Sequence, residues 1–120
     1  MNKVARPGQA ALRLVMAQIN LLVGDVAANS ERVIAAALRA RDELNADLIV
    51  FPELTLTGYP PEDLLLRPGL QLQVDAALQR IAAQALGIHV LLGYPEQVPE
   101  GRFNTAALIH DGKVLARCHK

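Results

Sequence analysis

One carboxylate occupies a position in the sequence from which it could do chemistry. Glu53 follows Phe51 and Pro52, at the end of a short apolar run that is typical of a strand buried on both faces. In open α/β sheets, ligands bind in the crevice beyond the carboxyl ends of the strands. Glu53 is therefore predicted to stand on a rigid strand end and to face a cleft. On this local pattern alone, a solvated acid at a strand end is the alternative.

A lysine at position 120 is the predicted partner of this carboxylate. Side chains of a strand alternate between its two faces. In a strand over 113–120, one set is mostly charged and should face water: Lys113, Leu115, Arg117 and His119. The other set should point inward: Val114, Ala116, Cys118 and Lys120. An unpaired buried ammonium is costly, so an inward Lys120 needs a carboxylate such as Glu53. A surface lysine at a frayed terminus is the alternative.

The elements that must position these groups alternate between strands and helices, after a loose arm over residues 1–10. Apolar periodicity, caps and turn residues predict them in this order: a strand over 12–20, a helix capped at Asn29 or Ser30, a strand over 47–52, a short helical piece over 62–66, a helix over 70–85, a strand over 89–92, and a hairpin of strands over 103–110 and 113–120. This order implies one layered α/β domain with no internal boundary.

Composition excludes several classes of function. The 120 residues carry no net charge and only 3% aromatic residues, which argues against a partner that is a nucleic acid or an anionic membrane. No signal peptide and no apolar run of membrane-spanning length is evident. The single cysteine, Cys118, cannot form an internal disulfide, so a reducing cytoplasm is expected. The three histidines have no spacing that is typical of a metal site.

Several motifs in order resemble one family. Residues 51–53, Phe-Pro-Glu, followed by residues 58–65, Gly-Tyr-Pro-Pro-Glu-Asp-Leu-Leu, resemble the nitrilase, or carbon–nitrogen hydrolase, superfamily. More narrowly, they resemble the glutaminase domains of glutamine-dependent NAD+ synthetases. Five further segments agree: Ala17-Gln18-Ile19-Asn20 with Val23-Gly24-Asp25, Gly93-Tyr94-Pro95, Asn104-Thr105-Ala106, Asp111-Gly112-Lys113 and Cys118-His119-Lys120.

The resemblance implies a fold and a triad. The fold is a four-layer α-β-β-α sandwich, of which residues 11–120 would be the N-terminal part. Glu53 matches the general base and Lys120 the lysine that stabilises the oxyanion, and Tyr59 would line the glutamine pocket. The family's nucleophilic cysteine lies well beyond the lysine, so it is not expected in this chain. Cys118, in mid-strand, is expected to be a small buried hydrophobic residue.

The resemblance also implies an activity and partners. Glutamine hydrolysis would release ammonia to a separate synthetase domain, which would use ATP and Mg2+ to amidate deamido-NAD+. No cofactor or metal is expected in this part, a homo-oligomer is expected, and the 120 residues alone are predicted to be inactive. Two alternatives remain: another amidase of the superfamily, or a non-catalytic α/β module.

Overall fold

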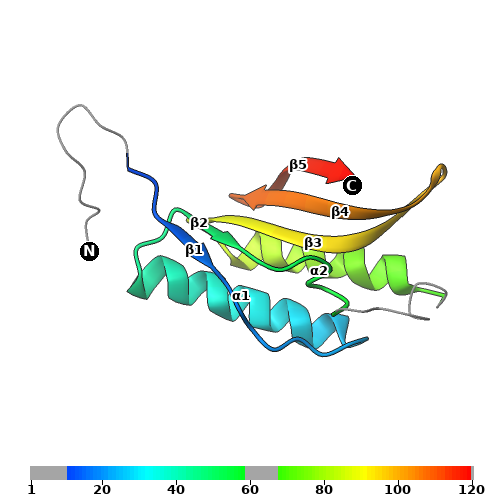
Figure 1. The fold of residues 1–120 in the computed structure, drawn as a ribbon, viewed down its shortest axis with the longest axis horizontal. Coiled ribbons are helices and arrows are strands. Elements are labelled where there is room, and N and C mark those ends of the chain that lie inside the picture. Colours follow the sequence, from blue (N-terminus) through cyan, green and yellow to red (C-terminus); the bar gives the residue numbers. More distant parts are fainter. Residues whose placement is uncertain (1–10, 59–67, 120) are drawn as a thin grey trace.

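The computed structural model describes residues 11–58 and 68–119, which form a five-stranded sheet and two helices (Figure 1). The elements in chain order are β1 (Leu14–Met16), α1 (Val26–Glu43), β2 (Leu48–Val50), α2 (Leu70–Gln84), β3 (His89–Val98), β4 (Gly101–His110) and β5 (Lys113–His119). The predicted alternation of strands and helices and the final hairpin are confirmed. The predicted arm over 1–10 and helical piece over 62–66 lie outside the described residues.

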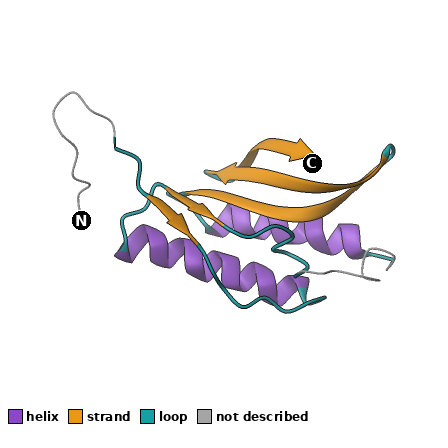
Figure 2. Ribbon diagram, viewed as in Figure 1, coloured by secondary structure: helices purple, strands orange, loops and turns teal. Residues whose placement is uncertain are grey.

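The sheet has one face that helices cover and one that they do not. Its strand order is β1-β2-β3-β4-β5, parallel from β1 to β3 and antiparallel from β3 to β5. Parallel strands joined through a helix are connected in a right-handed sense. Two such crossovers in the same direction therefore put α1 and α2 on the same side, as Figure 2 shows. We call the two sides the helix-covered face and the open face.

The hydrophobic core lies between the helix-covered face and the two helices. Alternate residues of β3, Val90, Leu92 and Tyr94, are at most 1% exposed. They meet apolar stripes of the helices at the predicted spacing: Val33, Ile34 and Ala37 from α1, and Val74, Ala77, Leu78 and Ile81 from α2. Among the described residues, neither helix is long and apolar enough to cross a membrane.

The predicted cap of the first helix is wrong. The helix begins at Val26, and Asp25 is its N-cap, accepting a hydrogen bond from the amide of Ala28 at 3.0 Å. Asn29 and Ser30 are buried within the first turns instead. The carboxamide of Asn29 bonds both backbone groups of Leu22, at 2.8 and 2.7 Å. Asn29 thus joins loops to the helix, a tertiary role that the local pattern did not reveal.

Three strand predictions are corrected in extent or burial. The first strand covers only Leu14–Met16, because the chain pairs with β2 over just three residues. The second is buried on one side only: Ile49 is 1% exposed, whereas its neighbours on the open face are half-buried. The third does not close at residues 93–95 but continues to Val98 as the partner of β4.

The faces of β5 also differ from the prediction. A register irregularity opposite Leu108 and Ile109 pairs Ile109 with Val114 but Leu108 with Ala116, so the alternation shifts by one residue within the strand. Val114 packs against the core, whereas Cys118, opposite Ala106, is exposed on the open face. The expectation of a buried Cys118 is therefore wrong.

Candidate active site

Glu53 stands where β2 stops pairing with β3. The amide of Phe51 still donates to the carbonyl of Leu91, at 2.9 Å. Pro52 has no amide hydrogen and cannot continue the ladder. Glu53 follows at once and is exposed, and Leu54 turns the chain with a positive φ of 54°. The predicted position of Glu53 at a strand end is confirmed.

The turn that carries Glu53 is held by hydrogen bonds within the turn and by one hydrogen bond from α1. The hydroxyl of Thr55 donates to the carbonyl of Pro52, and the amide of Gly58 donates to the carbonyl of Leu54 at 2.9 Å. From α1, the side chain of Asn29 donates to the carbonyl of Leu56 at 3.1 Å. Because these backbone groups are paired, the main chain on either side of the carboxylate has a defined path.

A glycine of β3 lies directly against the backbone of Glu53. A Cβ atom added to Gly93 would lie 2.8 Å from the amide nitrogen of Leu54 and 3.2 Å from Cα of Glu53. Real Cβ atoms do not approach backbone atoms so closely, so a larger residue here would displace the turn. Gly93 therefore allows the end of β2 to rest on β3.

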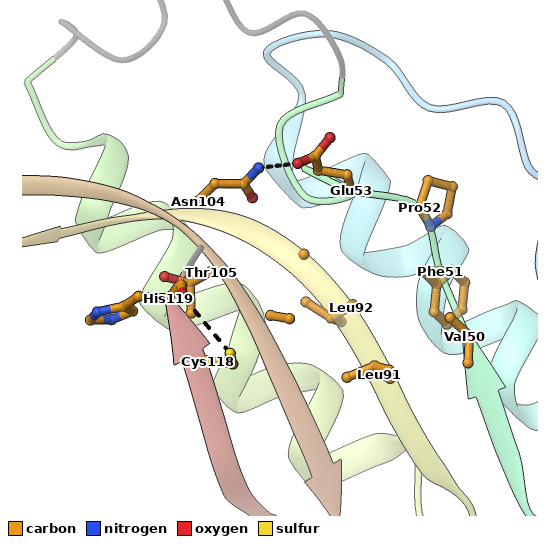
Figure 3. A pocket seen from close by; sticks show the side chains of 12 residues that line it. Val50, Phe51, Pro52, Glu53, Leu91, Leu92, Asn104, Thr105, Cys118 and His119 are labelled. Atoms are coloured by element: carbon orange, nitrogen blue, oxygen red, sulfur yellow. Dashed lines mark hydrogen bonds between the residues drawn. The ribbon is translucent and has the colours of Figure 1, made fainter.

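The carboxylate of Glu53 meets an amide side chain at the rim of a cavity on the sheet. Nδ2 of Asn104, on β4, donates a hydrogen bond to Oε1 of Glu53 (Figure 3). The cavity has a volume of about 430 Å³. Its lining is mostly apolar: Val50, Phe51, Pro52, Glu53, Leu91, Leu92, Gly93, Asn104, Thr105, Ala106, Cys118 and His119. A single carboxylate in such surroundings can accept a proton from a bound reactant.

The carbon–nitrogen hydrolase family matches residues 13–120, which is most of the sequence. This chain belongs to the carbon–nitrogen hydrolase family. Curated relatives include the glutamine-dependent NAD(+) synthetases of Xylella fastidiosa, 50% identical over 86% of this chain, and Xanthomonas campestris, 44% identical over 91%. The chain spans about a fifth of the length of these relatives, 19% and 20%.

Solved structures of the family agree with the fold described above. Glutamine-dependent NAD+ synthetase from Acinetobacter baumannii is similar with a TM-score of 0.85 and 36% identity, over 91% of this chain and 20% of that one. An amidase from Nesterenkonia is similar with a TM-score of 0.77 and 34% identity, over 91% of this chain and 42% of that one. The described helices and sheet form two of the four predicted layers.

Of the predicted site residues, the structure places Glu53 at the cavity. Lys120 and Tyr59 lie outside the described residues, so their roles and the Glu53–Lys120 pair stay predictions. Cys118 contributes to the cavity wall, with its Sγ 3.7 Å from the carbonyl oxygen of His119. Within residues 11–58 and 68–119, no group of three metal-ligating side chains is assembled.

Asn104 and Gly93 are not among the site residues predicted from the sequence. Both occur in short segments that agree with the family pattern, but neither has ionisable chemistry of its own. The available signal was a carboxamide inside the apolar strand over 103–110. Its contact with Glu53 spans 51 residues of sequence, and only the pairing of β3 with β4 brings the two together.

A polar network on the helix-covered face holds the end of β5 beside this site. Oε1 of Glu96 lies 2.5 Å from Nε2 of His119 and accepts from the hydroxyl of Thr105 at 3.3 Å. Nε of Arg117 donates to the buried hydroxyl of Tyr94 at 2.9 Å. Burial raises the pKa of Tyr94, although the hydrogen bond from Arg117 opposes that shift. These contacts tie β5 to β3 and β4.

Proposed function

We propose that this chain supplies part of the glutamine-hydrolysing site of a glutamine-dependent NAD+ synthetase, with Glu53 as its general base. The observation that carries the proposal is the carboxylate of Glu53, held at the end of β2 over an apolar cavity and hydrogen-bonded to Asn104. Half of the aligned residues are identical to those of a protein named glutamine-dependent NAD(+) synthetase, which supports the choice of glutamine as the amide.

The proposed reaction uses Glu53 to move one proton at a time. Glu53 takes the proton of a cysteine thiol, and the thiolate attacks the amide carbon of glutamine to form a C–S bond. The proton then passes from Glu53 to the leaving nitrogen, the C–N bond breaks, and ammonia departs. Glu53 next accepts a proton from water, whose oxygen bonds to the acyl carbon as the C–S bond breaks. This step yields glutamate, and the proton on Glu53 passes to the departing thiolate, which restores the cysteine and the carboxylate. The nucleophilic cysteine comes from outside these 120 residues.

Two residues outside the described part complete the proposed site. Lys120 is assigned to stabilise the negative charge that develops on the amide oxygen, because an ammonium in a water-poor pocket lowers the energy of an oxyanion. Tyr59 is assigned to the wall of the glutamine pocket. Both assignments come from the match of their sequence positions to the family motif.

The other parts of the proposal concern the complete protein. Ammonia passes to a synthetase domain that uses ATP and Mg2+ to amidate deamido-NAD+, and the protein is a cytoplasmic homo-oligomer. The 120 residues alone do not hydrolyse glutamine. Mass measurement of the native protein and fractionation of cells test its assembly and location.

The test is a comparison of two nitrogen sources in the complete enzyme. Glu53→Gln should lower glutamine-dependent NAD+ synthesis by about 100- to 10,000-fold, the usual contribution of a general base. Synthesis from added ammonia should not change. Glu100→Gln, an exposed acid between β3 and β4, is the matched control and should leave both rates unchanged. Glutamine-dependent activity of Glu53→Gln close to that of the unaltered enzyme would refute the proposal.

A second candidate is an amidase that releases ammonia from a simple amide, without a synthetase. The specific observation in its favour is the similarity to the Nesterenkonia amidase, which has been studied in complex with butyramide. The two candidates differ in substrate. Hydrolysis of butyramide faster than glutamine by the complete protein, with no ammonia-dependent NAD+ synthesis, would support the amidase.

A further inference from the structure

The side chain of Asn104 is directed at Glu53 by the register of the sheet. Gly93 pairs with Ala106, and Pro95 with Asn104, in the antiparallel ladder of β3 and β4. Asn104 and Ala106 are two residues apart, so both side chains lie on the open face. Gly93 brings the backbone of Glu53 against β3 on this same face. The side chain of Asn104, two residues before Ala106 on β4, can therefore reach the carboxylate of Glu53, as Figure 3 shows.

The contact between Asn104 and Glu53 lies among mostly apolar side chains of the described residues that line the cavity. β3 contributes Leu91, Leu92 and Gly93 to the cavity, and none of these side chains can bond a carboxylate. Among residues 11–58 and 68–119, the other titratable groups that line the same cavity are Cys118 and His119, both of β5. His119 is engaged with Glu96 through its Nε2. Asn104 thus supplies a neutral, fixed donor for one oxygen of Glu53.

We propose that Asn104 is a positioning residue for the general base, which orients the carboxylate of Glu53 and favours its ionised form. This inference rests on the proposed function of Glu53. An amide donor bonds the charged carboxylate better than the neutral acid, because an ionised acceptor makes the stronger hydrogen bond. The bond also limits rotation of the side chain, so the carboxylate keeps one orientation for proton transfer.

A positioning role and a substrate-binding role have different kinetic consequences. If Asn104 acts through Glu53, its loss lowers kcat, leaves the KM for glutamine nearly unchanged, and moves the acidic limb of the pH–rate profile. If Asn104 instead binds glutamine in the ground state, its loss raises KM and leaves the pH profile in place. These signatures can be separated in the complete enzyme.

The experiment measures glutamine-dependent kinetics of Asn104→Leu and Asn104→Asp between pH 5 and 9. Both should lower kcat by about 10- to 100-fold, with KM changed less than about threefold. The acidic limb should move to higher pH by about half a unit in Asn104→Leu and further in Asn104→Asp, whose carboxylate repels Glu53. Ammonia-dependent synthesis should stay constant in both, which reports an intact protein.

Asn20→Asp is the matched control, because Asn20 is exposed and its contact with Arg32 uses the main-chain carbonyl. It should behave as the unaltered enzyme. A raised KM with an unmoved acidic limb in Asn104→Leu would overturn the positioning role, and so would unchanged kinetics. Failure of Glu53→Gln to lower the rate would overturn the proposed function itself, so the two failures are distinguishable.

Discussion

The two faces of the sheet separate packing from chemistry. On the helix-covered face, Ile49, Val90 and Leu92 are at most 1% exposed. On the open face, Leu14 and Met16 are 48% and 75% exposed although they belong to the same sheet. The cavity with Glu53, Asn104 and Cys118 lies on the open face. The helix-covered face therefore provides the rigid support, and the open face carries the groups that are available for chemistry.

Because helices cover only one face of the sheet, truncating a side chain should affect the free energy of unfolding differently on the two faces. A side chain enclosed by two layers has contacts on all sides, and its truncation leaves a cavity that costs free energy beyond the lost transfer term. A side chain on the open face loses fewer contacts when it is shortened. The same residue type on opposite faces should therefore differ in its effect on stability, and β3 offers two adjacent leucines.

The largest effect should come from truncating the leucine that faces the helices. Leu92→Ala should lower the free energy of unfolding by about 2–5 kcal/mol, because Leu92 is 1% exposed. Leu91→Ala, its neighbour on the open face, is the matched variant and should cost less than about 1 kcal/mol. Urea unfolding of the 120-residue chain, followed by circular dichroism, measures both. Equal losses would mean that the faces are equally packed.

The elements that the sequence predicts well are those in which apolar residues recur at a regular spacing over many residues, or in which turn residues mark a hairpin. The stripe of α2, including Val74 and Ile81, and the hairpin at Asp111-Gly112 follow from local rules of spacing and turn chemistry. The position of Glu53 follows in the same way, because Phe51-Pro52 marks a strand end. Here local preference and tertiary structure agree.

The features that the sequence did not reveal depend on contacts between distant residues. Local rules predict that Asn29 caps a helix, yet its carboxamide forms hydrogen bonds with the backbone of Leu22 and Leu56. The register irregularity of β5, which exposes Cys118, arises in the pairing with β4. The alternation of apolar and polar residues in the sequence does not reveal it. The role of Asn104 likewise depends on the sheet register. Long-range pairing decides each of these cases.

A smaller effect should come from the polar edge of the helix-covered face. Tyr94 is fully buried and its hydroxyl accepts a hydrogen bond from Arg117. Tyr94→Phe should cost about 0.5–1.5 kcal/mol at neutral pH, the usual net worth of one hydrogen bond. It should leave glutamine-dependent kinetics nearly unchanged in the complete enzyme, since this face does not carry the proposed chemistry.

The same tyrosine predicts how stability depends on alkaline pH. Burial raises the pKa of Tyr94 above the unfolded value of about 10. Above that value the unfolded chain releases the phenolic proton more readily than the folded one. The stability that Tyr94 contributes is therefore full below about pH 10 and is lost as pH rises towards the folded pKa. Thermal unfolding at pH 8.5 and 10.5 should show a steeper decline for the unaltered chain than for Tyr94→Phe.

The smallest effect on folding, but a clear effect on association, should come from the open face itself. Met16 on β1 and Leu72 on α2 are both 75% exposed, so they differ in the surface they belong to and not in exposure. Replacing either by glutamine should change the free energy of unfolding by no more than about 0.5 kcal/mol.

Met16 lies on the same sheet face as other exposed or half-buried apolar side chains, whereas Leu72 is on the outer side of a helix. Adjoining apolar area drives association more than an isolated side chain does. Met16→Gln should therefore weaken self-association of the 120-residue chain in sedimentation velocity runs, and Leu72→Gln should not. Equal weakening by the two variants would mean that the open face has no special part in association.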